Sequence, residues 1–259
     1  SDCIWAHSWS ISARLDGKRI NKYSCSPEIR GSRGSNITHI GVICHELGHV
    51  LGCMDFYDTN YKTGGQYEGT GNWDLMASGN WNGDGACPAH FNPYVKIYDF
   101  GWAEPKMFNE ATYVTLYPKS EEGFVRINTQ TEDEYFLVEY RSKNGFDSCI
   151  PGNGLMIYRA SEGLSRYYSN SINAKHRQQF YPLCANSEFS IPNEIPESYG
   201  NVNSPSTPFP GTLNVKELTD YSKPGMINWN GAPTDLSITE IEEDAENRYV
   251  TFNYAGCTD

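Results

Sequence analysis

A chain of 259 residues and 29.2 kDa is long enough to bury a sizeable core, and it fits one large domain or two tightly joined subdomains. Its 20 lysines and arginines are outnumbered by 32 aspartates and glutamates, so the formal net charge is -12. A surface of this sign repels phosphate backbones and anionic lipid headgroups, so nucleic acid is not an expected partner. No apolar run reaches the roughly 20 residues of a membrane helix, so membrane insertion is not expected.

Eight cysteines in a chain rich in tyrosine and glycine favour an oxidising compartment. The expected location is therefore extracellular, cell-surface or periplasmic, and any signal peptide is expected to have been removed already. Reduced thiols in a cytosolic protein are the alternative. Cys149 and Cys184 are a candidate disulfide, whereas Cys44 and Cys53 are not, because eight or nine residues of helix would separate them by roughly 12 Å.

The first third of the chain predicts a hairpin followed by one helix. Residues 4–30 are predicted to be extended, with a turn at Asp16-Gly17. Ser35 or Asn36 then provides a helix N-cap. The helix should end at Gly52, because glycine readily adopts the left-handed turn that closes a helix. Apolar residues recur between these points at helical spacing, namely Ile37, Ile40, Ile43, Leu47 and Val50 or Leu51.

The remainder of the chain predicts loops followed by strands. Residues 53–93 are rich in glycine, asparagine, aspartate and tryptophan, which is typical of loops, and a short helix is expected from Asn92-Pro93 through Phe100. Strands are expected at 111–117, 123–129, 134–141 and 154–160, an irregular loop at 187–211 and a terminal hairpin at 235–254. The sequence therefore predicts an α+β fold, with a helix-and-loop region at 1–105 and a β-rich part at 106–259.

The stretch ICHELGHVLGCMDFYD, residues 43–58, contains the pattern His-Glu-x-x-His. Residues four apart on a helix lie about 40° apart around its axis, so His45 and His49 project from one face and can share a zinc ion. Glu46 then sits beside the metal, placed to take a proton from a water molecule. A helix that merely shows two histidines is the alternative, but chance produces this pattern in a chain of this composition only about once in a hundred.

A catalytic zinc needs three protein ligands and an open position for water. Asp55 is the candidate third ligand, because a left-handed turn at Gly52 can fold the chain back beneath the metal. Asp58, Glu68 and His90 are the other candidates. In a rival interpretation Gly52 is only a helix cap, and the two aspartates make turn hydrogen bonds or hold calcium, which makes calcium a second candidate ion.

The string HELGHVLGCMD, followed by NWDLMASGNW, resembles the metzincin pattern H-E-x-x-H-x-x-G-x-x-(His or Asp) with a methionine-containing turn beneath the zinc. Within that group the chain is similar to the immune-inhibitor-A family of secreted zinc peptidases. The similarity lies in the run from Asp55 to Asp58, in Trp73 to Trp81, in Gly101-Trp102 and in Glu134 to Tyr158.

The resemblance implies a metzincin-like zincin catalytic domain that acts as a secreted endopeptidase on protein or peptide substrates. His45, His49 and Asp55 would hold zinc, Glu46 would be the general base and Met76 would lie in the supporting turn. Only about forty residues precede the zinc helix, where such enzymes build a larger sheet. A propeptide or upstream segment of the same precursor is therefore an expected partner.

Two questions stay open at the level of the sequence. The donor that stabilises the oxyanion of the reaction is one of four residues, Tyr57, Tyr67, His90 and Tyr94. The alternative function is a non-catalytic, zinc-containing binding module that keeps the protease fold. The glutamate of the motif favours the enzyme, because a structural zinc site has no use for a base.

Overall fold

The computed structural model describes residues 4–31, 36–118 and 123–256, and it is a mixed α/β structure. Short 3₁₀ turns and one π-helical turn, Val95–Asp99, join the longer elements. The helix and strands are α1 (Ile40–Leu51), β1 (His7–Leu15), β2 (Lys18–Cys25), β3 (Thr112–Leu116), β4 (Phe124–Asn128), β5 (Tyr135–Arg141), β6 (Gly154–Ala160), β7 (Phe180–Pro182), β8 (Ser237–Asp244) and β9 (Tyr249–Ala255).

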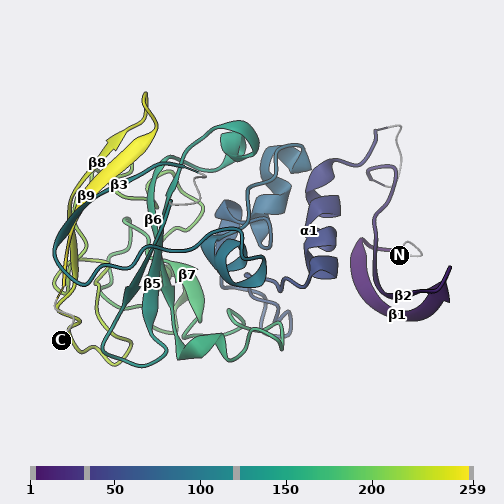
Figure 1. Cartoon of the computed structure of the whole chain (residues 1–259), viewed down its shortest axis with the longest axis horizontal. Coiled ribbons are helices and arrows are strands. Elements are labelled where there is room, and N and C mark those ends of the chain that lie inside the picture. Colours follow the sequence, from purple (N-terminus) through teal and green to yellow (C-terminus); the bar gives the residue numbers. More distant parts are fainter. Residues whose placement is uncertain (1–3, 32–35, 119–122, 257–259) are drawn as a thin grey trace.

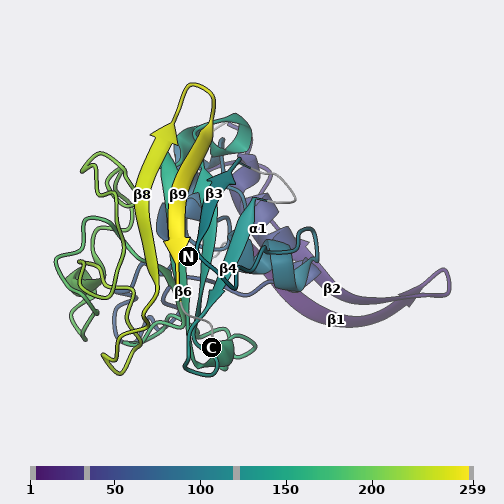
Figure 2. The ribbon, with the colours of Figure 1, turned by 60° about the vertical axis from the view of Figure 1, so that its left-hand side comes forward.

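The strands form three antiparallel sheets. β1 and β2 make a hairpin, β4-β5-β6-β7 make a four-stranded sheet, and β3-β9-β8 make a three-stranded sheet. Helix α1 lies between the hairpin and the body of the molecule (Figure 1), and β8, β9 and β3 run side by side at the opposite end (Figure 2). None of the helices in the described part of the chain has the length and apolarity needed to cross a bilayer.

The four-stranded sheet is buried on both faces, which is why β5 and β6 are buried along their whole length. Alternate residues of a strand point to opposite faces. Phe136 and Val138 therefore belong to the core beneath the three-stranded sheet, whereas Tyr135 and Leu137 belong to a second core that also contains Trp73 and its neighbours in the active-site loops. The active-site loops thus share a core with the β-rich part of the chain.

Most predicted strands and the predicted turn are confirmed. The hairpin turns at Asp16 and Gly17, whose φ angles of 49° and 76° are those of a tight two-residue turn. The four internal strands and the terminal hairpin are present within one or two residues of their predicted bounds. The short helix before Gly101 is present, but its regular part is a π-helical turn. Strand β7 was not predicted, because three residues carry no readable alternation.

The predicted start of the zinc helix is wrong. Ser35 lies outside the described residues, and α1 begins at Ile40 with His39 as its N-cap. The helix cannot start at Asn36 or Ile37, because Ile37 is in a bridge with Ile29. The predicted end is confirmed, since Gly52 has a φ angle of 117° and donates its N–H to the carbonyls of the last turn.

Helix α1 packs on the body through glycines rather than through its apolar residues. A Cβ atom on Gly41 would lie 1.9 Å from the Asn80 carbonyl oxygen, and one on Gly48 would lie 2.6 Å from Met76 Sδ. A different side of the helix carries an apolar stripe with exposed fractions of 42–59%. This stripe consists of Ile40, Ile43, Leu47 and Leu51. The helical spacing of these residues is confirmed, and the structure adds that the stripe is exposed.

The predicted pairing of Cys149 with Cys184 is not present, and none of the described cysteines forms a disulfide. Cys184 is fully buried, with its thiol directed at the Pro182 carbonyl. Cys149 instead lies beside Cys87, and both cysteines are next to Gly83. A Cβ atom built on that glycine would lie 3.1 Å from Cys87 Cβ and 3.2 Å from Cys149 Sγ. Their thiols are close enough to hydrogen-bond with one another.

In a glutathione redox buffer, where oxidised glutathione accepts the electrons, we expect Cys87 and Cys149 to form a disulfide. Both residues already lie beside Gly83, whereas Cys184 would have to leave its core. Mass spectrometry of a non-reduced digest checks this, and the linked peptide should persist in a Cys184→Ala variant. A peptide that links Cys149 to Cys184 would contradict the prediction.

Candidate metal centre

His45, His49 and Asp55 converge on one point at the end of α1. The Nε2 atoms of the two histidines are 3.2 Å apart. Asp55 Oδ1 lies 3.3 Å from His45 Nε2 and 3.2 Å from His49 Nε2. Among the described residues, these three form the group whose donor atoms could hold a metal ion.

Backbone carbonyls determine which nitrogen of each histidine faces this point. His45 Nδ1 is 2.8 Å from the Leu75 carbonyl oxygen, and His49 Nδ1 is 2.9 Å from that of Cys53. A carbonyl oxygen only accepts, so each Nδ1 carries a proton and donates it. Each neutral ring therefore presents the lone pair of Nε2 to the centre, which is the form in which histidine binds metals.

The site favours positive charge. Burial raises the pKa of Asp55, but the two histidines outweigh burial and hold its pKa well below the usual range. Burial lowers the pKa of His49, and Asp55 together with the Cys53 carbonyl more than reverses this, so that its pKa is raised. Asp55 Oδ1 is buried and has no hydrogen-bond partner in the protein. Two lone pairs and a carboxylate oxygen in one buried place need a cation.

The distances between the donor atoms fit zinc. Ligand atoms around a tetrahedral ion lie about 3.3–3.4 Å apart when each bond is about 2.0–2.1 Å long. The separations of 3.2–3.3 Å match this value. Two histidines with one carboxylate also form a ligand set that suits zinc. Residues His45, His49 and Asp55 therefore fit the metal that the sequence predicted.

The loop containing Met76 lies directly beneath the helix. Met76 is fully buried against Gly48, and its carbonyl accepts a hydrogen bond of 2.8 Å from the N–H of Phe56, the residue after the aspartate of the metal group. The preceding residue, Leu75, supplies the carbonyl that orients His45. This loop therefore holds the position of a histidine and of the chain next to Asp55.

The other candidate ligands lie elsewhere. Both carboxylate oxygens of Asp58 accept backbone N–H groups of its own loop. Glu68 is exposed and accepts a hydrogen bond from Asn203, and the His90 ring packs against Phe146. The turn hydrogen bonds of Asp58 agree with the rival interpretation for that residue, but no group among the described residues supports calcium.

The metal group opens onto a cleft of about 650 Å³. Glu46, 8% exposed, lines it, as do residues 6–10 of the hairpin, Lys22 and Tyr57. Of the four residues predicted as oxyanion donors, Tyr57 is the one in this lining. Burial and the nearby Asp55 raise the pKa of Tyr57, so its hydroxyl keeps its proton and remains a donor. A larger hollow of about 730 Å³, lined by Tyr67 and Tyr199 among others, contains none of the metal group.

One contact of the metal group was not predicted. Asn170, from a loop between β6 and β7, also lines the cleft and hydrogen-bonds Asp55. It is 115 residues from that aspartate in the chain and belongs to no motif, so no signal in a single sequence points to it.

A helix with His-Glu-x-x-His, a convergent aspartate and an adjoining cleft is the arrangement typical of metal-dependent peptidases. Comparison with known proteins narrows this class. Residues 1–102 match the family model described as immune inhibitor A peptidase M6, catalytic domain. The active-site region of the chain is thus similar to the catalytic domain of this family of metalloproteases. Zinc is the metal that the family and the donor set imply.

Two relatives are similar to part of this chain. Immune inhibitor A of Bacillus thuringiensis subsp. alesti is 27% identical over 164 residues, which are 51% of this chain and 22% of the relative. Pre-pro-metalloprotease PrtV of Vibrio cholerae serotype O1 (strain M66-2) is 44% identical over 118 residues, which are 38% of this chain and 11% of the relative. The chain thus spans less than a quarter of either relative's length. No solved structure matches.

Proposed function

We propose that this protein is a secreted zinc endopeptidase that hydrolyses peptide bonds of protein substrates. The observation that carries the proposal is the convergence of His45 Nε2, His49 Nε2 and Asp55 Oδ1 at 3.2–3.3 Å. Glu46, which is not part of this group, lines the same cleft. A zinc ion held by these three atoms would lower the pKa of a water molecule and polarise the scissile carbonyl.

The residues of the cleft have separate roles in this proposal. Glu46 accepts a proton from the attacking water and passes it to the leaving amine. The Tyr57 hydroxyl donates a hydrogen bond to the developing oxyanion. Met76 supports the metal group from below, as the methionine of a metzincin-like turn. The hairpin strand β1 borders the cleft and is placed to lie along an extended substrate.

Residues 1–105 and 106–259 act in this proposal as one catalytic unit of metzincin-like fold. Their shared core supports it, because Trp73 and Met76 pack in one cluster with Tyr135 and Leu137 of β5. A precursor segment is the proposed partner of the apolar stripe on α1. The support is the exposure of that stripe together with the description of the Vibrio cholerae relative as a pre-pro-metalloprotease.

The test is zinc content by elemental analysis and cleavage of casein, for the parent chain and for Asp55→Ala. We expect about one zinc per parent chain, cleavage that a chelator abolishes, and zinc binding at least about 10-fold weaker in the variant. Asp58→Ala is the matched control, because it removes a nearby buried aspartate that lies outside the metal group.

The outcomes separate the alternatives. Zinc bound equally tightly by Asp55→Ala would remove that residue from the ligand set. Zinc at one per chain without any cleavage would support the non-catalytic binding module. A parent chain that binds no zinc would overturn the proposal.

A further inference from the structure

Asn170 makes two reciprocal hydrogen bonds with Asp55. Its side-chain amide donates to Asp55 Oδ2 at 2.7 Å, and its side-chain carbonyl accepts the backbone N–H of Asp55 at 2.6 Å. One side chain thus holds both the carboxylate and the backbone of the same residue. We propose that Asn170 is a positioning residue of the metal centre, which fixes Asp55 so that Oδ1 alone faces the two histidines. This inference rests on the proposed zinc site.

The arrangement divides the two oxygens of the carboxylate. Oδ2 is occupied by the amide of Asn170, while Oδ1 has no hydrogen bond and lies 3.2–3.3 Å from both histidine nitrogens. Rotation about the last side-chain bond of Asp55 would break the hydrogen bond to Oδ2. Asn170 therefore favours binding of the metal through one oxygen and leaves room for water at the fourth position.

Asn170 is itself held in place by its own backbone contacts. Its φ angle of 52° is in the left-handed region, which asparagine tolerates better than most residues. Its N–H donates to the Tyr167 carbonyl at 2.8 Å, and its carbonyl accepts the Thr59 hydroxyl at 2.6 Å. The side chain that reaches Asp55 thus starts from a fixed turn rather than from a free loop.

The same loop makes a second contact with the chain just before Asp55. The Tyr167 hydroxyl accepts the N–H of Met54 at 3.3 Å and donates to the Asp99 carboxylate. Residues 167–170 lie beyond the stretch that matches the family model, which ends at residue 102. The β-rich part of the chain therefore contributes directly to the geometry of the metal centre.

The experiment compares Asn170→Gly with Asn214→Gly. Glycine accepts the left-handed backbone of Asn170, so the first variant removes the amide without straining the turn. Asn214 has nearly the same φ angle, 56°, and lies on the exposed surface outside the metal group, so it is a matched control. Zinc affinity is measured by competition with a chromophoric chelator, and the ligand field by the visible absorption of the cobalt(II) form.

We expect zinc binding about 10–100-fold weaker in Asn170→Gly, with a changed cobalt spectrum, and no change in Asn214→Gly. A general loss of stability is separated by comparing the melting temperatures of zinc-saturated and zinc-free protein. Weaker binding should reduce the rise in melting temperature that zinc produces in Asn170→Gly, whatever its zinc-free stability.

Two different results separate an incorrect role for Asn170 from an incorrect zinc site. A parent chain without zinc overturns the site itself. A parent that binds zinc, with equal affinity and an unchanged cobalt spectrum in Asn170→Gly, overturns the role of Asn170 alone.

Discussion

Replacement of Glu46 by glutamine is expected to lower the rate of casein cleavage by about 10²–10⁴-fold while zinc stays bound. Glutamine has nearly the same shape but cannot accept a proton. Glu46 lines the cleft and is not among the three residues whose donor atoms converge, so the metal should keep its ligands. The measurements are the turnover number on casein and zinc affinity by chelator competition, on the same preparations.

The split between the two readouts is what tests the role of Glu46. Loss of cleavage and of zinc together would mean that the glutamate supports the site rather than the reaction. Cleavage at the parent rate would show that another group takes the proton. Glu68→Gln is the control, because Glu68 is an exposed glutamate outside the cleft, and it should change neither readout by more than about twofold.

The metal group could be predicted because its chemistry is local. His45, Glu46, His49 and Asp55 lie within eleven residues, and one helix with a glycine turn is enough to bring them together. Helical spacing predicts a shared face without any knowledge of the rest of the fold. The structure agrees with this geometry, while the assignment of metal and roles stays a prediction for experiment.

The contacts between distant parts of the chain could not be predicted. Asn170 and Cys149 act through neighbours that are brought close only by tertiary packing. Periodicity also shows that a helix has an apolar side but not what that side contacts. On α1 the side that packs is the one with Gly41 and Gly48, because only residues without a Cβ allow so close an approach.

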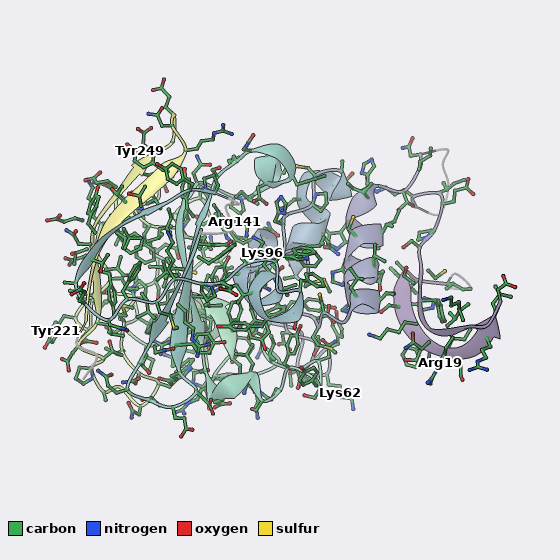
Figure 3. All side chains as sticks on the ribbon, viewed as in Figure 1. Arg19, Lys62, Lys96, Arg141, Tyr221 and Tyr249 are labelled. Carbon is green, nitrogen blue, oxygen red and sulfur yellow. The ribbon has the colours of Figure 1, made fainter. Side chains whose placement is uncertain are left out.

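Replacement of Arg141 by methionine is expected to lower the free energy of unfolding by about 3–5 kcal/mol. The guanidinium is 2% exposed and pairs with Asp147 at 2.7 Å and Glu139 at 3.1 Å, and it donates to the Trp73 carbonyl at 2.8 Å. Figure 3 shows Arg141 inside the body of the molecule, whereas Arg19 lies on the hairpin. The change would leave two buried carboxylates without their main partner.

Urea unfolding of the zinc-free protein measures this effect, with Arg19→Met as the control. Arg19 is exposed, so its replacement should change the free energy of unfolding by less than about 0.5 kcal/mol. A loss below about 1 kcal/mol in Arg141→Met would contradict the prediction, because it would mean that Lys96, which also pairs with Glu139 at 3.2 Å, compensates for the missing charge.

The effect should also depend on pH. Burial raises the pKa of Asp147, but Arg141 and the N–H of His90 outweigh burial and lower it to about 2. This folded pKa lies below the unfolded value of about 3.9. The pair therefore stabilises the fold fully at pH values above the unfolded pKa, and it loses its effect as the pH falls toward 2. The difference in unfolding free energy between the parent and Arg141→Met should therefore shrink between about pH 5 and pH 2.

Since Arg141 holds Trp73, three residues before Met76, the same variant should also bind zinc less tightly at neutral pH than Arg19→Met does.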